Sequence, residues 1–364
     1  MKYLPDSIGL YIHIPFCAKK CLYCDFYSAI KSEKVYKDYL DALLREINKW
    51  GKRITRPVDT VYIGGGTPSL LGRDIVPLMR EIRESFSVSE NAEITAECNP
   101  GCDVSFFSYA KECGVNRLSL GVQSGNDARL KKLGRTHTAE DVRSAFYFAR
   151  QAGFDNISCD IMIALPDSDL KTLKEDIDFV CSLSPEHISA YILKIEPNTA
   201  FYKWQDNLNL PDEDFAADQY LFLCKTLESR GFEHYEISNF AKCGRKSRHN
   251  LKYWHCEEYL GIGPAAHSFL SGKRFYYPRD IKGFIAGNSP KDDGEGGTAA
   301  EKIMLGLRLK EGAPEDLFSA AALLKAEDFE KEGLLKAANG RIALTDKGML
   351  LSNSIITEFL YEDL

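Results

Sequence analysis

The chain has 364 residues, of which 44% are hydrophobic, which suffices for one large α/β barrel with an appended small domain or for several ordinary domains. Its formal net charge of −7 argues against general affinity for nucleic acid. The first residues lack a signal-peptide pattern and no run of 18 apolar residues occurs, so we expect a cytoplasmic protein without a transmembrane helix.

Strand-like and helix-like segments alternate up to residue 230. The strand-like segments span residues 10–14, 58–65, 92–97, 116–124, 156–166 and 187–195. Helical spacing of apolar residues follows them, over residues 35–50, 74–86, 103–113, 127–133 with 139–152, 170–183 and 212–230. Six strand–helix units in succession predict an α/β fold in which a parallel sheet has helices outside it. We interpret the strands as apolar on both faces, as is usual in such sheets.

Two arrangements of these units are open, a doubly wound sheet and an incomplete barrel. Polar or glycine residues fall at or near the C-terminal ends of four strands, at Gly64–Thr67, Glu97, Gln123 and Asp160. In barrels this end of the strands carries the functional site. The pattern therefore favours a partial (β/α)6 barrel of the TIM type.

The pattern changes after residue 235. Residues 236–290 are rich in aromatic residues, histidines and glycines, and predict a loop-rich segment of short strands that ends in a polar linker at 289–298. Residues 291–364 predict a small mixed, winged-helix-like domain, with helices at 301–312 and 329–335 and a short wing before a last helix. Because this block is not basic, DNA binding is the weaker interpretation. We expect three parts, residues 1–235, 236–290 and 291–364.

Three of the eleven cysteines, Cys17, Cys21 and Cys24, lie within eight residues, and the others are scattered. A disulfide with one spare thiol is disfavoured in a reducing cytoplasm. A zinc site needs four ligands, and no second cysteine pair accompanies these three. A [4Fe–4S] cluster bound by three thiolates accounts for the pattern and leaves one iron open. An open coordination position is the usual mark of a site that performs chemistry.

The segment from Cys17 to Cys24 resembles the C-x-x-x-C-x-x-C signature of the radical S-adenosylmethionine superfamily. The resemblance implies a [4Fe–4S] cluster whose open iron is chelated by S-adenosylmethionine, and whose electron cleaves the sulfonium to give a 5′-deoxyadenosyl radical. Residues 64–68 (GGGTP) likewise resemble the glycine-rich motif that contacts the amino group of this cofactor. Without Cβ atoms, backbone carbonyl groups can approach an ammonium closely. A tight turn is the alternative role of these glycines.

Within this superfamily the chain looks closest to the anaerobic coproporphyrinogen oxidases and their haem-chaperone relatives, over residues 9–270. The motifs GLYIHIPFC, YIGGGTPS, GVQSxxDxxLxxLGRxH and DxMxxLP recur in that order. The resemblance implies that the following residues contact S-adenosylmethionine: Tyr11 and Tyr23 beside the cluster, Gly65, Gly66 and Thr67 at the methionine part, and Glu97, Gln123, Arg135, Asp160 and Lys194 elsewhere. Carboxylates can accept from ribose hydroxyls or an ammonium, and an arginine can pair with the methionine carboxylate. A structural contact at the sheet edge is the alternative for each.

Two features separate the oxidases from the chaperones. The oxidases have a fourth cysteine two residues after the third, where this chain has Phe26 after Asp25. They also carry an N-terminal extension, whereas 16 residues precede Cys17 here. The segment from His249 to Trp254 (HNLKYW) matches an H-N-x-x-Y-W motif of the haem-chaperone branch, in which the histidine is associated with haem binding. A packed histidine is the alternative, and the competing haem ligands are His255 and His267.

These features favour a haem chaperone that binds a [4Fe–4S] cluster, S-adenosylmethionine and haem, and delivers haem to client haemoproteins with the help of an electron donor. A membrane-associated client is compatible with this interpretation. The main alternative is the oxygen-independent decarboxylation of two propionates of coproporphyrinogen III to vinyl groups, in porphyrin biosynthesis. A radical-generating enzyme with another substrate is the third possibility. No catalytic residue is assigned, and whether the protein is an enzyme stays open.

Overall fold

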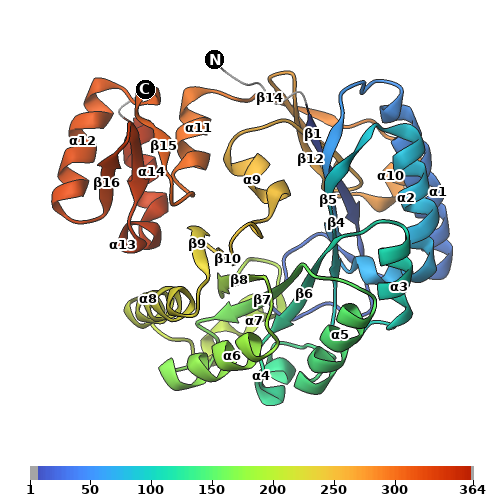
Figure 1. Ribbon diagram of the computed structural model, residues 1–364, viewed down its shortest axis with the longest axis horizontal. Helices are drawn as coiled ribbons and strands as arrows, with labels where there is room; N and C mark the ends of the chain where they lie inside the picture. The colour runs from blue at the N-terminus through green and yellow to red at the C-terminus, as the bar shows by residue number, and fades with distance from the viewer. Residues whose placement is uncertain (1–6, 362–364) are drawn as a thin grey trace.

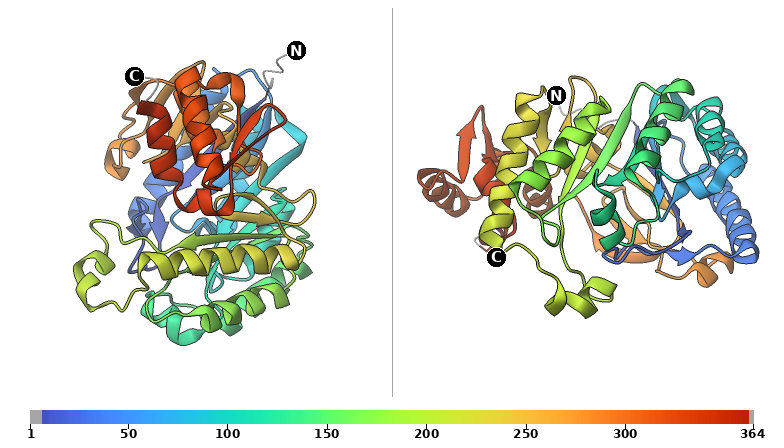
Figure 2. Two further views of the ribbon diagram at one scale, coloured as in Figure 1. Left: turned by 90° about the vertical axis from the view of Figure 1, so that its left-hand side faces the viewer. Right: turned by 90° about the horizontal axis from the view of Figure 1, so that it is seen from below.

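The computed structural model describes residues 7–361, so the outermost residues of the first and last predicted parts lie outside the described chain. Six parallel strands lie side by side in chain order at the centre of a 12-stranded sheet. They are β1 (Ile8–Ile14), β4 (Val58–Gly65), β5 (Val88–Cys98), β6 (Arg117–Gln123), β7 (Ile157–Ile163) and β8 (His187–Ile192). The sheet curves, and helices cover its outer side (Figures 1 and 2). The prediction of a partial α/β barrel of six strand–helix units is confirmed.

The outer helices begin and end within a few residues of the predicted positions. They are α1 (Glu33–Gly51), α2 (Ile75–Ser85), α3 (Ser105–Glu112), α4 (Asp127–Lys132), α5 (Ala139–Gln151), α6 (Leu170–Ser182) and α8 (Glu213–Ser229). The short elements η1 (Pro68–Asp74), α7 (Ala200–Trp204) and η2 (Gln205–Asn207) lie in the connections. Capping boxes at Thr138 and Asp169 fix the starts of α5 and α6, because each side chain accepts a hydrogen bond from the third residue of its helix.

The inner face of the sheet is polar, so the prediction that the strands are apolar on both faces is wrong. Side chains alternate along a strand. On β6, Arg117 and Ser119 line an internal cavity, whereas Leu118 and Leu120 are completely buried on the helix-covered side. The neighbouring strands contribute further polar residues to the inner face: Tyr62 on β4, Glu97 on β5, Asp160 on β7 and Ser189 on β8. The incomplete barrel encloses a site rather than a packed apolar centre.

Residues 236–290 contribute short strands of three or four residues to both edges of the sheet. β9 (Glu233–Glu236) and β10 (Asn239–Ala241) lie beyond β8. The chain then passes along the inner side of the sheet through α9 (Arg248–Trp254) and becomes β11 (Tyr259–Ile262), which pairs in parallel with β1 at the opposite edge (Figure 1). β12 (His267–Leu270), β13 (Lys273–Tyr276) and β14 (Lys291–Glu295) follow as antiparallel strands, with α10 (Ile281–Ile285) between the last two. The prediction of a polar linker at 289–298 is therefore wrong for residues 291–295, which form β14.

The C-terminal region combines helices with a small sheet, as predicted. Its helices are α11 (Ala299–Gly306), α12 (Ala320–Lys331), α13 (Asp346–Leu350) and α14 (Ser352–Tyr361), with η3 (Glu315–Leu317) before α12. The three strands have the order β15 (Ala313–Pro314), β17 (Arg341–Leu344) and β16 (Leu335–Ala338). The helix predicted at 329–335 is wrong in its second half, because Gly333 adopts φ +75° and the chain turns into β16. Within residues 7–361, none of the helices has the length and apolar character that crossing a membrane requires.

Candidate cofactor site

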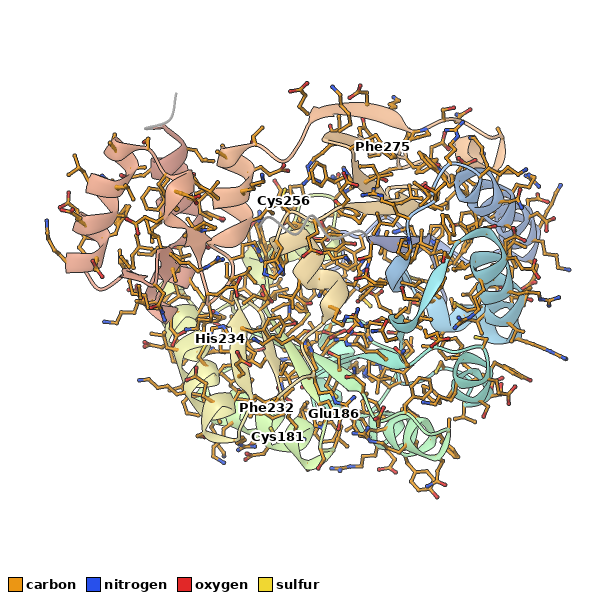
Figure 3. The ribbon with its side chains drawn as sticks, turned by 45° about the horizontal axis from the view of Figure 1, so that its top comes forward. Cys181, Glu186, Phe232, His234, Cys256 and Phe275 are labelled. Atoms are coloured by element: carbon orange, nitrogen blue, oxygen red, sulfur yellow. The ribbon has the colours of Figure 1, made fainter. Side chains whose placement is uncertain are left out.

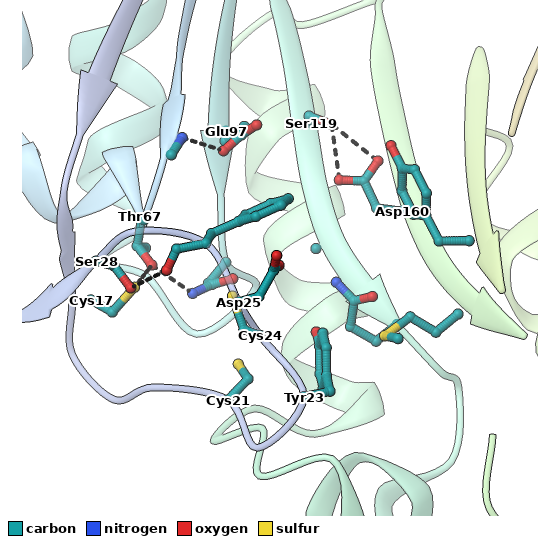
Figure 4. A pocket seen from close by; sticks show the side chains of 18 of the residues that line it. Cys17, Cys21, Tyr23, Cys24, Asp25, Ser28, Thr67, Glu97, Ser119 and Asp160 are labelled. Carbon is teal, nitrogen blue, oxygen red and sulfur yellow. Dashed lines mark hydrogen bonds between the residues drawn. The ribbon is translucent and has the colours of Figure 1, made fainter. Parts of the chain in front are cut away.

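The three clustered cysteines lie on the loop between β1 and α1. Two short strands, β2 (Phe16–Cys17) and β3 (Ala29–Ile30), pair at the base of this loop. All three thiols border one cavity at the C-terminal ends of the parallel strands (Figure 4). Thr67 Oγ1 donates to Cys17 Sγ at 3.5 Å, and Arg135 Nη1 donates to Cys21 Sγ at 3.3 Å. Hydrogen bonds of this kind tune thiolates that bind iron.

The donor set fits a [4Fe–4S] cluster with one open iron. Within residues 7–361 no histidine lines this cavity, and the one further cysteine that borders it is Cys98. Cys98 is buried, and its thiol donates to the carbonyl of Ser119 at 3.6 Å. Burial raises the pKa of the Cys24 thiol to about 11. Binding of iron by Cys24 must therefore release its proton.

The glycine-rich motif lies against the cysteine loop. Gly66 N and Thr67 N donate to the carbonyl oxygens of Ile14 and Phe16, each at 2.8 Å. Gly65 adopts φ +113°, and a Cβ atom there would meet the His13 ring at 2.6 Å. A Cβ atom at Gly66 would meet Phe16 O at 2.6 Å. Both positions require glycine, which keeps the backbone of this segment open to the cavity.

Two carboxylates line the cavity from neighbouring parts of the sheet. Glu97 accepts from Tyr62 OH at 2.9 Å and from Gly65 N at 3.0 Å. Burial raises its pKa to about 7. The Asp160 oxygens accept from Ser119 Oγ at 3.1 and 3.0 Å, and burial also raises the pKa of Asp160. Around neutral pH, Glu97 can therefore take up or release a proton when a ligand binds.

Arg135 and Gln123 lie near the end of the cavity that the three cysteines border. Arg135 Nη2 donates to Asn99 Oδ1 at 2.7 Å and to Gly121 O at 2.6 Å, so its guanidinium is held in place without a carboxylate partner. Gln123 ends β6 with φ +65°, a conformation that costs free energy for a residue with a Cβ atom. Its side chain lines the cavity.

The cavity has a volume of about 390 Å³ and brings together most of the residues predicted to hold cofactor. Those that line it are Cys17, Cys21, Tyr23, Cys24, Gly65, Gly66, Thr67, Glu97, Gln123, Arg135, Asp160 and Lys194. Lys194 borders it from the rim, where its side chain is 80% exposed and pairs with Glu196 at 2.7 Å. Tyr11 does not line the cavity, because its hydroxyl lies 2.9 Å from His13 Nδ1 and its ring stacks beside Tyr62.

His249 is the predicted residue whose surroundings differ most from the expectation. It lies on α9 with no exposed surface. Both ring nitrogens are engaged, since Nδ1 lies 2.8 Å from Thr60 Oγ1 and Nε2 lies 2.8 Å from Tyr253 OH. Burial, with Lys252 nearby, lowers the pKa of His249 to about 3, so the imidazole is neutral. In this conformation His249 is packed and hydrogen-bonded, and it has no nitrogen free for a metal.

Several lining residues were missed by reasoning from the sequence. They include Tyr62, Asn99, Arg117, Ser119, Ser189, Tyr191 and Asn250. Most could have been found from a period of two within the strands, because polar residues recur at positions 117, 119 and 123 and at 187, 189 and 191. Asn250 has no such signal, because only the tertiary path of α9 brings it to the cavity.

Comparison with known proteins gives consistent matches. The family profile of the Radical SAM superfamily matches residues 11–180, and that of the HemN C-terminal domain matches residues 298–351. The heme chaperone HemW of Bacillus subtilis (strain 168) is 38% identical, with 97% of this chain and 99% of that protein covered. HemW of Escherichia coli (strain K12) is 36% identical, with 98% of each covered. The solved structure of coproporphyrinogen III oxidase (HemN) from Escherichia coli, a radical SAM enzyme, has a TM-score of 0.83 and 25% identity, covering 97% of this chain and 90% of that chain.

Proposed function

This chain belongs to the family of the heme chaperone HemW within the radical SAM superfamily, and from this membership we propose that it binds haem and delivers it to client haemoproteins. The single observation that supports the proposal most is the full-length similarity to HemW at 38% identity. Phe26 adds to it, because it stands where the similar oxidases have a fourth cysteine. Its side chain is 62% exposed at the cavity that the three cysteines border.

As a member of the radical SAM superfamily, the protein uses a [4Fe–4S] cluster and S-adenosylmethionine, and the bound pair supplies one-electron cleavage of a carbon–sulfur bond. We propose that Cys17, Cys21 and Cys24 hold three irons. Thr67 and Arg135 orient two of these thiolates. The remaining predicted contacts act by hydrogen bonding, with carboxylates facing the hydroxyl or ammonium groups of the cofactor.

We also propose that the three predicted parts divide these tasks. Residues 1–235 would hold cluster and S-adenosylmethionine, and residues 236–290 would bring the HNLKYW segment to the site. Residues 291–364 would form a docking region for a client, with their first strand, β14, belonging to the main sheet. The first two parts share one sheet through the pairing of β1 with β11. We therefore expect residues 1–235 and 236–290 to act as one structural unit.

Anaerobic incubation tests the chaperone against the oxidase. The reconstituted protein is mixed with coproporphyrinogen III, a reductant and S-adenosylmethionine, and the products are separated by chromatography. We expect no protoporphyrinogen IX, together with a stable complex when the same preparation is titrated with haem. Clear turnover of coproporphyrinogen III would overturn the chaperone proposal in favour of the oxidase.

Binding of S-adenosylmethionine is expected to depend on pH through Glu97. Because the pKa of Glu97 is raised to about 7, the acceptor form is lost as the pH falls below that value. Affinity should drop by up to about tenfold per pH unit below 7, and Glu97→Gln should flatten this dependence. Equilibrium dialysis of the cluster-loaded protein at several pH values measures both. An identical slope in wild type and variant would remove Glu97 from the site.

The same raised pKa has a consequence for the ligand-free protein. Between the ordinary value of 4.5 and about 7, the folded chain holds a proton on Glu97 that the unfolded chain has released. The contribution of Glu97 to stability therefore declines as the pH rises through this window. Glu97→Gln should show a smaller decline, which thermal unfolding without ligand can record.

Haem binding by His249 requires one of its nitrogens to become free. We expect His249→Ala to weaken haem binding by at least about tenfold and to change the haem spectrum. Tyr253→Phe is the matched control, because it removes the partner of Nε2 at 2.8 Å and leaves the imidazole in place. It should bind haem at least as tightly as the wild type. Unchanged affinity and spectrum in His249→Ala would give His249 a structural role and direct the search to His255 and His267.

A further inference from the structure

Arg117 is a buried cation that lines the cavity, and among residues 7–361 its side chain has no hydrogen-bond or salt-bridge partner. It begins β6, its relative exposure is 2%, and its side chain is the largest of those fully buried. Its backbone is paired in the sheet, but its side-chain Nε is buried without an acceptor. Yet Arg117 lines the cavity. A guanidinium carries five donors, and leaving them unmatched in a buried place is costly.

Burial raises the pKa of the nearby carboxylates Glu97 and Asp160 and the positive charge of Arg117 lowers it in part, but their hydrogen bonds are made to other groups. Glu97 accepts from Tyr62 and Gly65, and Asp160 accepts from Ser119. The second cavity arginine, Arg135, differs from Arg117, because it donates to Asn99, Gly121 and Cys21. Arg117 therefore presents its donors to whatever ligand occupies its part of the cavity. A planar fork of this kind suits a carboxylate, which can accept two parallel hydrogen bonds.

Arg117 lies too far from the cysteine loop to bind the methionine carboxylate of a cofactor that chelates the open iron. Arg117 begins β6 and Gln123 ends it, so their backbones are separated by roughly 20 Å along the strand. The cysteine loop and Arg135 lie toward the Gln123 end, where Arg135 donates to Cys21. The methionine group of a cofactor that chelates the open iron stays at that end. A carboxylate that pairs with Arg117 must therefore come from a group other than the methionine part of that cofactor.

The surroundings of Arg117 suit an aromatic ring system with an acidic arm. Tyr62 and Tyr191 line the same cavity, and Asn250 enters it from α9, next to His249. Tyrosine rings offer flat apolar faces to a macrocycle. The Asn250 side chain forms no hydrogen bond within the described part of the chain, so its amide can also serve a ligand.

We propose that Arg117 binds a carboxylate of a ligand in the cavity, and that this carboxylate is a propionate of haem. This inference rests on the proposed function. Asn250 of the HNLKYW segment then borders the haem from α9, while the cysteine loop lies at the far end of the same cavity. Arg117 acts as a specificity residue for a tetrapyrrole with free acid side chains.

The test compares haem with haem dimethyl ester, in which both propionates are esterified. Each is titrated into the full-length, cluster-loaded protein in the presence of S-adenosylmethionine, for wild type, Arg117→Gln and Arg143→Gln. The last is a matched control, because Arg143 lies on α5, its side chain is 52% exposed, and it is outside the cavity. Wild type and Arg143→Gln should prefer haem by about 10- to 100-fold. In Arg117→Gln the preference should fall to about one.

A preference for haem that is equal in wild type and in folded Arg117→Gln would overturn the proposal. Modification of the wild type by phenylglyoxal does not depend on the folding of a variant. Haem, and not its dimethyl ester, should protect Arg117, as located by mass spectrometry, and equal protection by both would also overturn it.

A further arm compares S-adenosylmethionine with its decarboxylated analogue. If Arg117→Gln weakens only the intact cofactor, the carboxylate belongs to S-adenosylmethionine and the propionate assignment is wrong. Absence of any haem binding in the wild type would instead overturn the proposed function itself. Haem binding with no discrimination against the ester overturns the role of Arg117 alone.

Discussion

Replacing Cys21 with alanine is expected to abolish the iron–sulfur cluster. The thiol borders the cavity together with those of Cys17 and Cys24, and Arg135 donates to it at 3.3 Å. Its loss removes one of the three proposed thiolate ligands and leaves Arg135 Nη1 without its hydrogen-bond acceptor. Iron bound after anaerobic reconstitution should fall from about four atoms per chain to near zero, with loss of the visible absorption of the cluster.

Cys243→Ala provides the matched control for this measurement. Cys243 is exposed and does not line the cavity, so its removal should leave iron content and the visible spectrum unchanged. Circular dichroism of both variants establishes that the chain is folded. Retention of a full cluster by Cys21→Ala would show that another residue supplies the third ligand.

Replacing Asp176 with alanine is expected to destabilise the barrel strongly. Asp176 lies on α6 and is 4% exposed. It accepts from Ser124 Oγ at 2.8 Å, from Gly125 N at 2.7 Å and from Arg129 Nη2 at 3.0 Å. The variant leaves the charge of Arg129, whose side chain is 12% exposed, without compensation. The free energy of unfolding should fall by about 3–5 kcal/mol, measured from urea unfolding curves.

The control is Asp178→Ala, two residues along the same helix. Asp178 pairs with Lys174 and Arg230, but its side chain is 43% exposed. Solvent screens these pairs, so the free energy of unfolding should fall by about 1 kcal/mol or less. Equal losses in the two variants would mean that the Asp176 network is not what holds the turn after β6 onto α6.

The fold of residues up to 230 follows from local patterns, because each strand–helix unit has its own apolar periodicity and caps. The meeting of Cys17, Cys21 and Cys24 at one cavity was also predictable, since they lie within eight residues. Glu97 lies at the C-terminal end of β5 as predicted, whereas Asp160 lies in the middle of β7, and both side chains line one cavity. Gly65 and Glu97 meet in this cavity because neighbouring parallel strands end at the same edge of the sheet.

The pairing of β11 with β1 could not be predicted from local patterns. β11 has four residues, Tyr259–Ile262, and finds its partner about 250 positions earlier in the chain. The partners of His249 and the location of Asn250 depend on this path, because α9 leads directly into β11. The polar inner face was misjudged for another reason: the usual rule for parallel strands assumes a packed centre, whereas this sheet encloses a polar cavity.

The late pairing of β1 also matters while the protein is being made. During synthesis one side of β1 can pair with β4 as soon as residues 58–65 have been made, whereas its other side has no partner until residues 259–262 have been made. Until those residues leave the ribosome, β1 is an edge strand with unpaired amide and carbonyl groups, next to the loop that carries the cysteines. Its exposed backbone can pair with other chains during that interval. The order of synthesis thus leaves an unprotected strand edge at β1 until β11 has been made.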